Sequence, residues 1–300
     1  MIKWNRTLCF IILLFSIFIL LFLFCNIQRT FSNIINIYDC KLSHIESDDF
    51  FCEIDNDWYR RKKLFYLQHN RNRYLNSTYM FFQDNYEPTF SCQFEQRLGI
   101  NGDGGKWICD VYRLKQLKSC LIYSLGSNGE FSFENEIKHY LPNCDIHTFD
   151  MKEFNCTDMC TFHKVNIGSG FDGTKTLRMI MSELNHSQHH IDILKIDVEG
   201  SEYEFFDNLF NTSDHLSQNI RQILVEIHLS TIIRQVNNTP VYDFEKIHHL
   251  FDLFHKNHFV IFHKEVNLYN PHQAFEFSFI RLNEKFFQIK NYSTSIEHLR

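Results

Sequence analysis

Two carboxylates stand directly after a short apolar run in the second half of the 300-residue chain. Ile191–Ile196 (IDILKI) is followed by Asp197, Glu199 and Gly200, and then by apolar residues at helical spacing. An apolar run of this length before a glycine is typical of a buried strand. A strand that places acids at its carboxyl end and turns into a helix builds ligand sites in open α/β sheets. The alternative is that both acids only cap the following helix.

A glycine-bearing turn upstream favours the ligand site over the helix cap. Cys120–Leu125 (CLIYSL) predicts a second buried strand, and a helix is expected over residues 130–138. The turn between them consists of Gly126, Ser127, Asn128 and Gly129. Its backbone N–H groups can bind a ligand at the start of that helix, because glycines leave room for close approach.

Polar residues also end two other predicted strands. Asp150 ends the strand expected over 145–149, about 20 residues after the turn, where nucleoside-binding sheets hold ribose hydroxyls. Glu226 and His228 end the strand expected over 220–227. Asp197, Glu199 and His228 are therefore candidate catalytic bases, and Glu226 with His228 could join Asp197 around a divalent cation. The alternative for His228 is a hydrogen-bonded core or rim histidine, and we predict no metal site.

The elements that must position these residues alternate between strand and helix. Strands are expected over residues 120–125, 145–149, 161–167, 191–196 and 220–227. Helices are expected over residues 130–138, 177–184, 202–210 and 241–258. Such alternation predicts an α/β fold with a doubly wound, mostly parallel sheet. Two further strands, over 259–262 and 275–280, are expected to close the sheet as a hairpin-like pair.

An apolar run over residues 8–25 predicts a membrane-spanning signal anchor. At ~1.5 Å per residue such a run nearly crosses the ~30 Å hydrocarbon layer. Lys3 and Arg6 precede the run and few basic residues follow it, which keeps the N-terminus cytosolic. The rival interpretation is a cleaved signal peptide, but no small-residue cleavage site follows the run. We therefore expect a single-pass type II membrane protein of the Golgi or endoplasmic reticulum, with its catalytic domain in the lumen.

This reading divides the chain into a cytosolic tail (1–7), an anchor (8–25), a stem (26–90), a catalytic domain (91–285) and a C-terminal tail (286–300). The stem holds Asp55-Asn56-Asp57, a triplet of the type with which glycosyltransferases hold a metal and a nucleotide diphosphate. Because only a poor apolar strand precedes this triplet, a helix N-cap or a solvated loop is the stronger interpretation.

Cysteines and glycosylation sequons agree with a secretory compartment. Eight cysteines follow the apolar run, an even number that suits disulfides. Cys92 and Cys109 flank the glycine-rich turn at 102–105, and they are the first pair that we expect to be bonded. The alternative is reduced, buried thiols in a cytosolic enzyme; Cys156 and Cys160 have no second pair and do not indicate zinc. Six sequons also follow the run, at Asn76, Asn155, Asn185, Asn211, Asn237 and Asn291.

The chain carries a net charge of −6, and the part beyond the apolar run is more acidic because Lys3, Arg6 and Arg29 all lie before residue 30. An acidic domain argues against nucleic acid or an anionic membrane surface as a partner. Membrane association is therefore expected only through the N-terminal helix.

Two motifs resemble those of a known enzyme family. ILKIDVEGSE, at 193–202, is similar to the KIDVEGxE signature of FkbM-like methyltransferases, and YSLGSNGEFSFE, at 123–134, resembles their first glycine motif. With GINGDGGKWIC and the N-terminal anchor, the chain resembles membrane-anchored methyltransferase-like proteins over about residues 91–282. The resemblance implies S-adenosylmethionine as the methyl donor. It also implies a Rossmann-like class I sheet of seven strands in the order 3-2-1-4-5-7-6, with the seventh antiparallel.

The resemblance implies roles for the candidate residues. The turn Gly126–Gly129 would cradle the methionine part of the donor, and Asp150 would take the ribose hydroxyls. Asp197 and Glu199 would lie where the fourth strand meets the donor and the acceptor.

One residue departs from the family pattern. Many methyltransferases carry an acid two residues before the first glycine, where this chain has Ser124. In those enzymes the acid helps to orient the amino group of the donor, and Glu130 or Glu134 could supply the missing charge here. Lys106 and Trp107 could cover the donor, or they could simply pack a loop.

Three functions remain open from the sequence alone. The first is an S-adenosylmethionine-dependent methyltransferase of the secretory lumen that O-methylates a glycan, lipid or protein. The second is a catalytically inactive, methyltransferase-like binding module, which Ser124 supports. The third is a type II lumenal glycosyltransferase, suggested by the membrane topology and the triplet at 55–57.

Overall fold

The computed structural model describes residues 15, 17–23, 40–71, 81–156, 158–212, 215–229, 233–236, 239–271 and 273–288. Contacts within the chain divide it into two compact units, Met1–Tyr59 and Arg60–Arg300, and each is considered by itself. Residues 15 and 17–23 are helical, while the rest of the predicted anchor at 8–25 lies outside the described residues. Within the part that the structure describes, no helix is both long enough and apolar enough to cross a membrane.

The first unit is a short helical segment closed by a disulfide. Helix α2 (Lys41–Glu46) lies between Cys40 and Cys52, which are bonded to each other. Helix α3 (Asp55–Arg71) begins in this unit, and both acids of the predicted triplet stand in its first turn. Asp55 Oδ1 accepts a hydrogen bond of 2.8 Å from the backbone N–H of Leu42. The triplet therefore has the helix-start position that the sequence favoured over a nucleotide–metal site.

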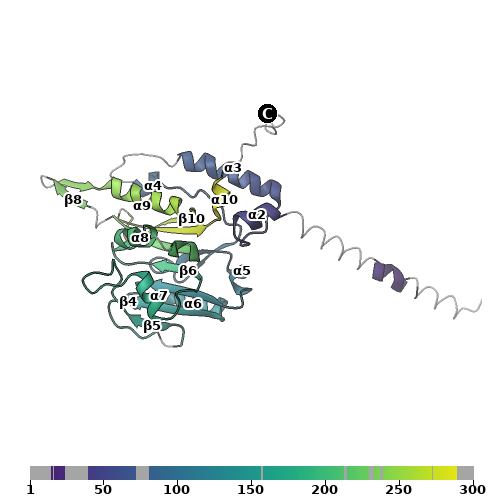
Figure 1. Ribbon diagram of the computed structural model, residues 1–300, viewed down its shortest axis with the longest axis horizontal. Helices are drawn as coiled ribbons and strands as arrows, with labels where there is room; N and C mark the ends of the chain where they lie inside the picture. The colour runs from purple at the N-terminus through teal and green to yellow at the C-terminus, as the bar shows by residue number, and fades with distance from the viewer. Residues whose placement is uncertain are drawn as a thin grey trace, which may run out of the picture. The chain divides into compact units, whose positions relative to one another are not determined.

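The second unit is built on a seven-stranded sheet of order β10-β11-β7-β6-β3-β4-β5 (Figure 1). Numbered along the chain, strands one to seven of this sheet are β3, β4, β5, β6, β7, β10 and β11. From β5 to β10 their spatial order is therefore 3-2-1-4-5-7-6, the order expected from the resemblance. Strand β11 is antiparallel to both of its neighbours, and the other pairings are parallel, as predicted. The strands are β3 (Cys120–Leu125), β4 (Cys144–Asp150), β5 (Thr161–Lys164), β6 (Ile191–Ile196), β7 (Ile220–His228), β10 (Phe259–Val266) and β11 (Ala274–Arg281).

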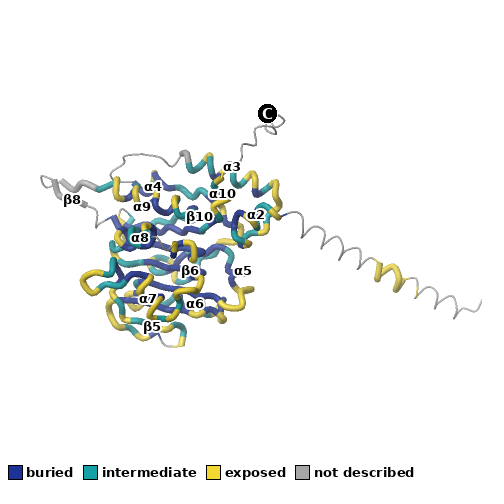
Figure 2. The backbone as a smooth tube through the Cα atoms, in the orientation of Figure 1, coloured by how far each residue is buried: buried dark blue, intermediate teal, exposed yellow. Residues whose placement is uncertain are grey.

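Helices cover one face of the sheet because their apolar stripes meet its alternate residues. Leu121, Tyr123 and Leu125 of β3 belong to one buried cluster with the apolar side chains of these helices. The helices on this face are α4 (Phe81–Asp84), α7 (Leu177–Glu183), α8 (Glu202–Phe210) and α9 (Phe244–Lys256). Figure 2 shows most of the sheet as the dark blue, buried interior of this unit, whereas the edge strand β5 is partly exposed.

The opposite face carries a helix and a small hairpin. Helix α6 (Ser132–Tyr140) buries Phe133 and Ile137. Strands β1 (Glu95–Leu98) and β2 (Lys106–Cys109) pair antiparallel. The side-chain amide of Gln222 in β7 exchanges two hydrogen bonds with the backbone of Cys109, at 2.9 and 2.8 Å. The hairpin is thereby fixed over the middle of the sheet. The remaining short helices are α5 (Val111–Lys115), η1 (Leu216–Asn219) and α10 (Glu284–Phe287).

Several element boundaries differ from the predictions; the strand expected over 259–262, for example, continues to Val266. The helix expected over 241–258 begins at Phe244, because Thr239–Tyr242 forms strand β9, paired with β8 (Ile233–Val236), and Asp243 caps the helix. The helix expected from residue 130 begins at Ser132, because the carboxylate of Glu130 folds back onto the Ser132 backbone N–H. The strand expected over 161–167 ends at Lys164, although Ile167 makes one isolated bridge to Lys175.

The eight cysteines after the apolar run form four disulfides. Cys92 is bonded to Cys109, which confirms the pair expected from the sequence. The other bonds are Cys40–Cys52, Cys120–Cys144 and Cys156–Cys160. Oxidised cysteines of this number are typical of secreted and lumenal proteins.

Candidate active site

The glycine turn and Asp150 lie together at the carboxyl edge of β3 and β4. Asp150 is buried, and its Oδ2 accepts hydrogen bonds from the backbone N–H groups of Ser127 at 3.0 Å and Asn128 at 2.8 Å. Its Oδ1 accepts a bond of 2.9 Å from the Lys152 N–H. Asp150 therefore holds the turn in shape, a role that the sequence did not indicate. Each carboxylate oxygen has further lone-pair directions for a ligand.

Gly126 brings this turn against the loop that follows β6. Its φ is +78°, and a Cβ added to it would lie 1.7 Å from the backbone oxygen of Asp197. The Asp197 N–H donates to Leu125 O at 2.8 Å, and Lys195 Nζ donates to Gly126 O at 2.9 Å. The two predicted motifs thus form one edge, and only glycine fits where they touch.

Glu134 reaches the position at which many methyltransferases carry an acid. Ser124 Oγ donates a hydrogen bond to Glu134 Oε1, and both side chains are buried. Among the described residues, no hydrogen-bond partner faces Glu134 Oε2. The other predicted substitute, Glu130, instead bonds both the N–H and the hydroxyl of Ser132. An unpartnered carboxylate oxygen beside the first strand suits a ligand that carries an ammonium group.

A buried lysine stands among three carboxylates at the same edge. Lys106 of β2 forms an ion pair with Glu276, and its Nζ lies 3.6 Å from Asp197 Oδ2 and 3.8 Å from Glu226 Oε2. Burial acts to lower the pKa of Lys106, but the charges of Glu276, Asp197 and Glu226 raise it above its ordinary value. Lys106 is therefore a permanent ammonium ion in this site. We name Lys106, Asp197, Glu226 and Glu276 the Lys106 cluster.

The carboxyl groups of the Lys106 cluster differ in protonation. Burial, together with the charges of Glu276 and Asp197, raises the pKa of Glu226 to about 8. Burial also acts to raise the pKa of Asp197, but Lys106, Lys195 and His228 lower it below its ordinary value. At neutral pH Asp197 is therefore ionised, whereas Glu226 carries a proton and accepts a bond of 2.6 Å from the Asn267 amide.

His228 forms ion pairs on both sides of its ring. Its Nδ1 lies 2.8 Å from Glu202 Oε1 and its Nε2 lies 3.4 Å from Glu199 Oε2. Burial acts to lower the pKa of His228, but the hydrogen bond to Glu202 and the charges of Glu202, Glu226 and Asp197 raise it to about 9. At neutral pH the ring is an imidazolium, which suits anion stabilisation or proton donation better than the predicted role of base.

Asp197, Glu199 and His228 are brought together as predicted. One ligand atom from each lies within 4.8 Å of the others, and the same holds for Asp103, Asp197 and Glu226. Such sets can hold a divalent cation as well as move a proton. Trp107, by contrast, stacks on the ring of His263 with centroids 4.1 Å apart, so it packs the hairpin.

The sequence did not predict three residues that form ion pairs in the site: Lys106, Glu202 and Glu276. Lys106 was expected only as a residue that could cover the donor or pack a loop. Glu202 is the last residue of the KIDVEGxE motif, and it also accepts a bond of 3.0 Å from the Gly200 N–H. Glu276 is a lone acid within the apolar strand β11, which is an unusual place for a charge. That pattern could have marked it, whereas nothing near Lys106 in the sequence indicates its partners.

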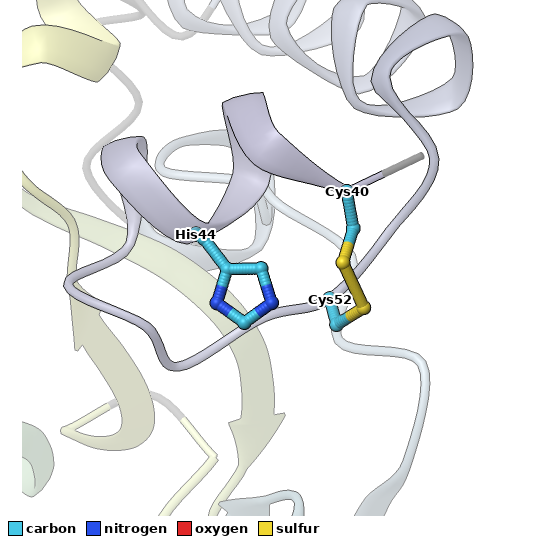
Figure 3. A group of neighbouring side chains, drawn as sticks. All are labelled: Cys40, His44 and Cys52. Atoms are coloured by element: carbon cyan, nitrogen blue, oxygen red, sulfur yellow. A yellow bond between two sulfur atoms is a disulfide. The ribbon is translucent and has the colours of Figure 1, made fainter. Parts of the chain in front are cut away.

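A cysteine–histidine group in the first unit does not form a zinc site with thiolate ligands. Figure 3 shows His44 beside Cys40 and Cys52, whose sulfur atoms are joined in a disulfide. Disulfide sulfurs are not the thiolates that bind zinc. His44 Nδ1 instead lies 3.0 Å from Asp49 Oδ1.

The free energy of unfolding is expected to fall as the pH rises from about 6.5 to about 9, by on the order of 3 kcal/mol. The folded chain raises the pKa of His228 from 6.5 to about 9, and that of Glu226 from 4.5 to about 8. In this pH range the folded state therefore binds more protons than the unfolded state does. Urea unfolding at pH 6.5, 7.5 and 9 measures the slope. The double variant His228→Gln/Glu226→Gln should flatten it, and an unchanged slope would contradict the two assignments.

Comparison with known proteins places the chain in a family. A family model described as methyltransferase domain matches residues 41–281, so the chain belongs to the methyltransferase domain family. Together with the observed strand order, this match identifies the fold as the Rossmann-like class I methyltransferase fold. The match begins at residue 41, so it also includes much of the predicted stem.

Methyltransferase-like protein 24 is a similar relative. The rat protein (Rattus norvegicus) is 30% identical over 127 residues, which cover 37% of this chain and 34% of the relative. The human protein (Homo sapiens) is 31% identical over 127 residues, which cover 37% of this chain and 33% of the relative. The matched region thus spans about a third of the length of these curated relatives.

Solved structures show weaker similarity. A fibrillarin pre-rRNA processing protein of Methanococcus jannaschii has a TM-score of 0.38 and 11% identity, over 60% of this chain and 72% of that one. Aeropyrum pernix fibrillarin, solved with natively bound S-adenosyl-L-methionine, has a TM-score of 0.34 and 12% identity, over 63% and 83%. Similarity at this level does not assign a ligand or a substrate to this chain.

Proposed function

We propose that this chain is a methyltransferase that uses S-adenosylmethionine and binds it over Gly126–Gly129. The observation that carries the proposal is the shared edge of β3, β4 and β6, where Asp150 holds the turn through two backbone N–H groups. The Asp197 backbone closes the same edge against Gly126. The family match makes a methyl donor the ligand that we expect at this edge.

The residues present fit the donor. Asp150 would meet the ribose hydroxyls, and the unpartnered oxygen of Glu134 would meet the ammonium group of the methionine part. S-adenosylmethionine supplies a methyl group on an already activated sulfonium. The protein then has to align the acceptor and exclude water. In this proposal Glu134 supplies the acid that is absent at Ser124, and that absence was the main support for an inactive binding module.

The Lys106 cluster would handle the acceptor proton. An acceptor hydroxyl loses its proton on methylation, and a positioned base accelerates such a step by ~10²–10⁴-fold. Asp197 is ionised and would accept the proton directly, whereas Glu226, with a pKa of about 8, would accept it only in the fraction of molecules in which it is ionised. Lys106 would hold both carboxyl groups in place, and the His228 imidazolium would stabilise negative charge on the acceptor.

The proposal extends to an FkbM-like O-methyltransferase of the secretory lumen, anchored by residues 8–25 and acting on a glycan, lipid or protein. Its supports are the IDVEGSE motif, the apolar N-terminal run, the six sequons and the four disulfides. Of the sequon asparagines, Asn155, Asn185 and Asn211 are exposed. A glycosyltransferase is disfavoured because the triplet at 55–57 opens helix α3.

Asp150→Ala is expected to weaken binding of S-adenosylmethionine by at least about tenfold, because it removes charge-assisted hydrogen bonds and releases the turn. Titration calorimetry of the full chain with S-adenosylmethionine and S-adenosylhomocysteine measures this loss. Asp252→Ala, an exposed substitution on α9, is the matched control and should bind as the wild type does.

The outcomes separate the proposed functions. If the wild type binds neither ligand, the methyl-donor assignment is wrong. Binding of a UDP-sugar with Mn²⁺ would favour the glycosyltransferase. Affinity that is unchanged in a folded Asp150→Ala variant would place the donor away from β4.

A further inference from the structure

A group of imidazoles lies on the helix-covered face at the open edge of the sheet. Asp145 and His147 belong to β4, His163 belongs to the edge strand β5, and His186 follows α7. We name Asp145, His147 and His186 the edge cluster. At ~3.3 Å per residue, Asp145 lies roughly 16 Å along β4 from Asp150. The edge cluster is therefore separate from the candidate active site.

The ligand atoms of the edge cluster converge. Asp145 Oδ2 lies 3.1 Å from His147 Nε2, and one ligand atom from each of the three residues lies within 4.8 Å of the others. In a tetrahedral zinc site with bonds of about 2.0–2.2 Å, neighbouring ligand atoms lie about 3.3–3.5 Å apart. Asp145 is largely exposed and His186 partly so, so small side-chain rotations can complete such a geometry.

His147 Nε2 is a buried nitrogen that makes no hydrogen bond within the described chain, although the Asp145 carboxylate is close. Its other nitrogen, Nδ1, lies 2.8 Å from His163 Nε2. The contact with His163 allows either tautomer of His147. In the tautomer in which Nδ1 donates, the Nε2 lone pair faces a carboxylate oxygen at 3.1 Å, an arrangement that a bound cation would stabilise.

In both His147 and His186, one ring nitrogen contacts a polar group of the protein, as is usual for metal-binding histidines. His163 orients His147, and the Tyr123 hydroxyl lies 2.7 Å from His186 Nδ1. Ligating histidines almost always use their second nitrogen in this way, which fixes the ring and its tautomer.

We propose that Asp145, His147 and His186 bind one divalent transition-metal ion, with zinc as the best match to two imidazoles and a carboxylate. Three protein ligands leave a fourth position for water, on the side where Asp145 is exposed and His186 partly exposed. The ion would join β4 to the segment between α7 and β6, and so would stabilise the edge of the sheet. The other use of these rings is plain aromatic packing, since His147 and His163 stack at 5.1 Å.

Zinc titration of the full chain, after removal of metal with EDTA, tests the proposal. The wild type should bind zinc at this site and melt at a higher temperature with zinc than without it. His186→Ala and Asp145→Asn should each weaken that binding by at least about tenfold, and Tyr123→Phe by about tenfold through the outer contact. His139→Ala, an exposed histidine on α6, is the matched control and should bind zinc like the wild type.

Metal analysis and thermal melting report the result without any methyl-transfer assay. Zinc held by Asp197, Glu199 and His228 would survive the edge-cluster substitutions, so the comparison of variants distinguishes the two places. If zinc affinity and the melting shift are the same in the wild type, His186→Ala and Asp145→Asn, the edge cluster is a packing group and the proposal is wrong. A wild type that binds no zinc overturns it equally.

Discussion

Lys106→Met is expected to lower the free energy of unfolding by about 3–5 kcal/mol at pH 7.5, as removal of one partner from a buried ion pair typically does. Lys106 is almost fully buried, and Asp197, Glu226 and Glu276 surround its ammonium group. Methionine fills a similar volume but carries no charge. The variant would therefore keep the packing and leave carboxylates facing one another in a site with little water.

Urea unfolding across a range of pH separates this charge effect from a packing effect. Glu226 already carries a proton at neutral pH, and the other two carboxyl groups take up protons as the pH falls, so the deficit of Lys106→Met should shrink toward pH 5. Adding Glu276→Gln should restore part of the stability at pH 7.5. Lys115→Met, an exposed lysine on α5, is the matched control and should lie within about 0.5 kcal/mol of the wild type. A deficit that is equal at pH 5 and pH 7.5 would show that charge is not its cause.

Gly126→Ala is expected to destabilise the chain by more than about 4 kcal/mol, or to prevent folding, and to abolish donor binding. Two costs add at this position. A non-glycine residue at a positive φ costs about 1–3 kcal/mol. The new Cβ would also lie 1.7 Å from the backbone oxygen of Asp197, and neither backbone segment can move without breaking the hydrogen bonds between them.

Gly173 provides a matched control that isolates the collision of the new Cβ with Asp197. Gly173 has a φ of +80°, close to the +78° of Gly126, but a Cβ added there meets nothing within 4 Å. Gly173→Ala should therefore show only the cost of the backbone conformation. The difference between the two variants in urea unfolding isolates the collision with the β6 loop. Equal destabilisation in both variants would show that the two loops do not touch in solution.

Much of the sheet could be predicted because its signals are local. Each parallel strand is a short apolar run followed by a turn residue, and an alternation of strand and helix limits the topology to few choices. The carboxyl ends of parallel strands meet at one edge, so the meeting of Gly126, Asp150 and Asp197 followed from strand order alone.

Helix starts were less predictable. The helix at 241–258 begins late because residues 239–242 pair with another strand, which their spacing did not show.

The residues that the sequence did not mark act across long separations in the chain. Lys106 meets Glu276 across 170 residues, and no local pattern links them. The edge cluster likewise draws on β4 and on the loop after α7. The pairing of Cys92 with Cys109 was predictable because a tight turn lies between them, whereas Cys120 and Cys144 come together only through the pairing of β3 with β4.

The Cys92–Cys109 bond links the redox state of the compartment to the charge balance of the candidate active site. It closes a loop at a sequence separation of 17 and ends β2, the strand that carries Lys106 into the acidic edge. Closing a loop of this size stabilises a fold by about 3 kcal/mol. A chain made in a reducing compartment would hold that strand by hydrogen bonds and packing alone. Lys106, the counter-charge of the buried acids, would then be held less firmly, so reduction of this bond is expected to weaken the charge balance of the site.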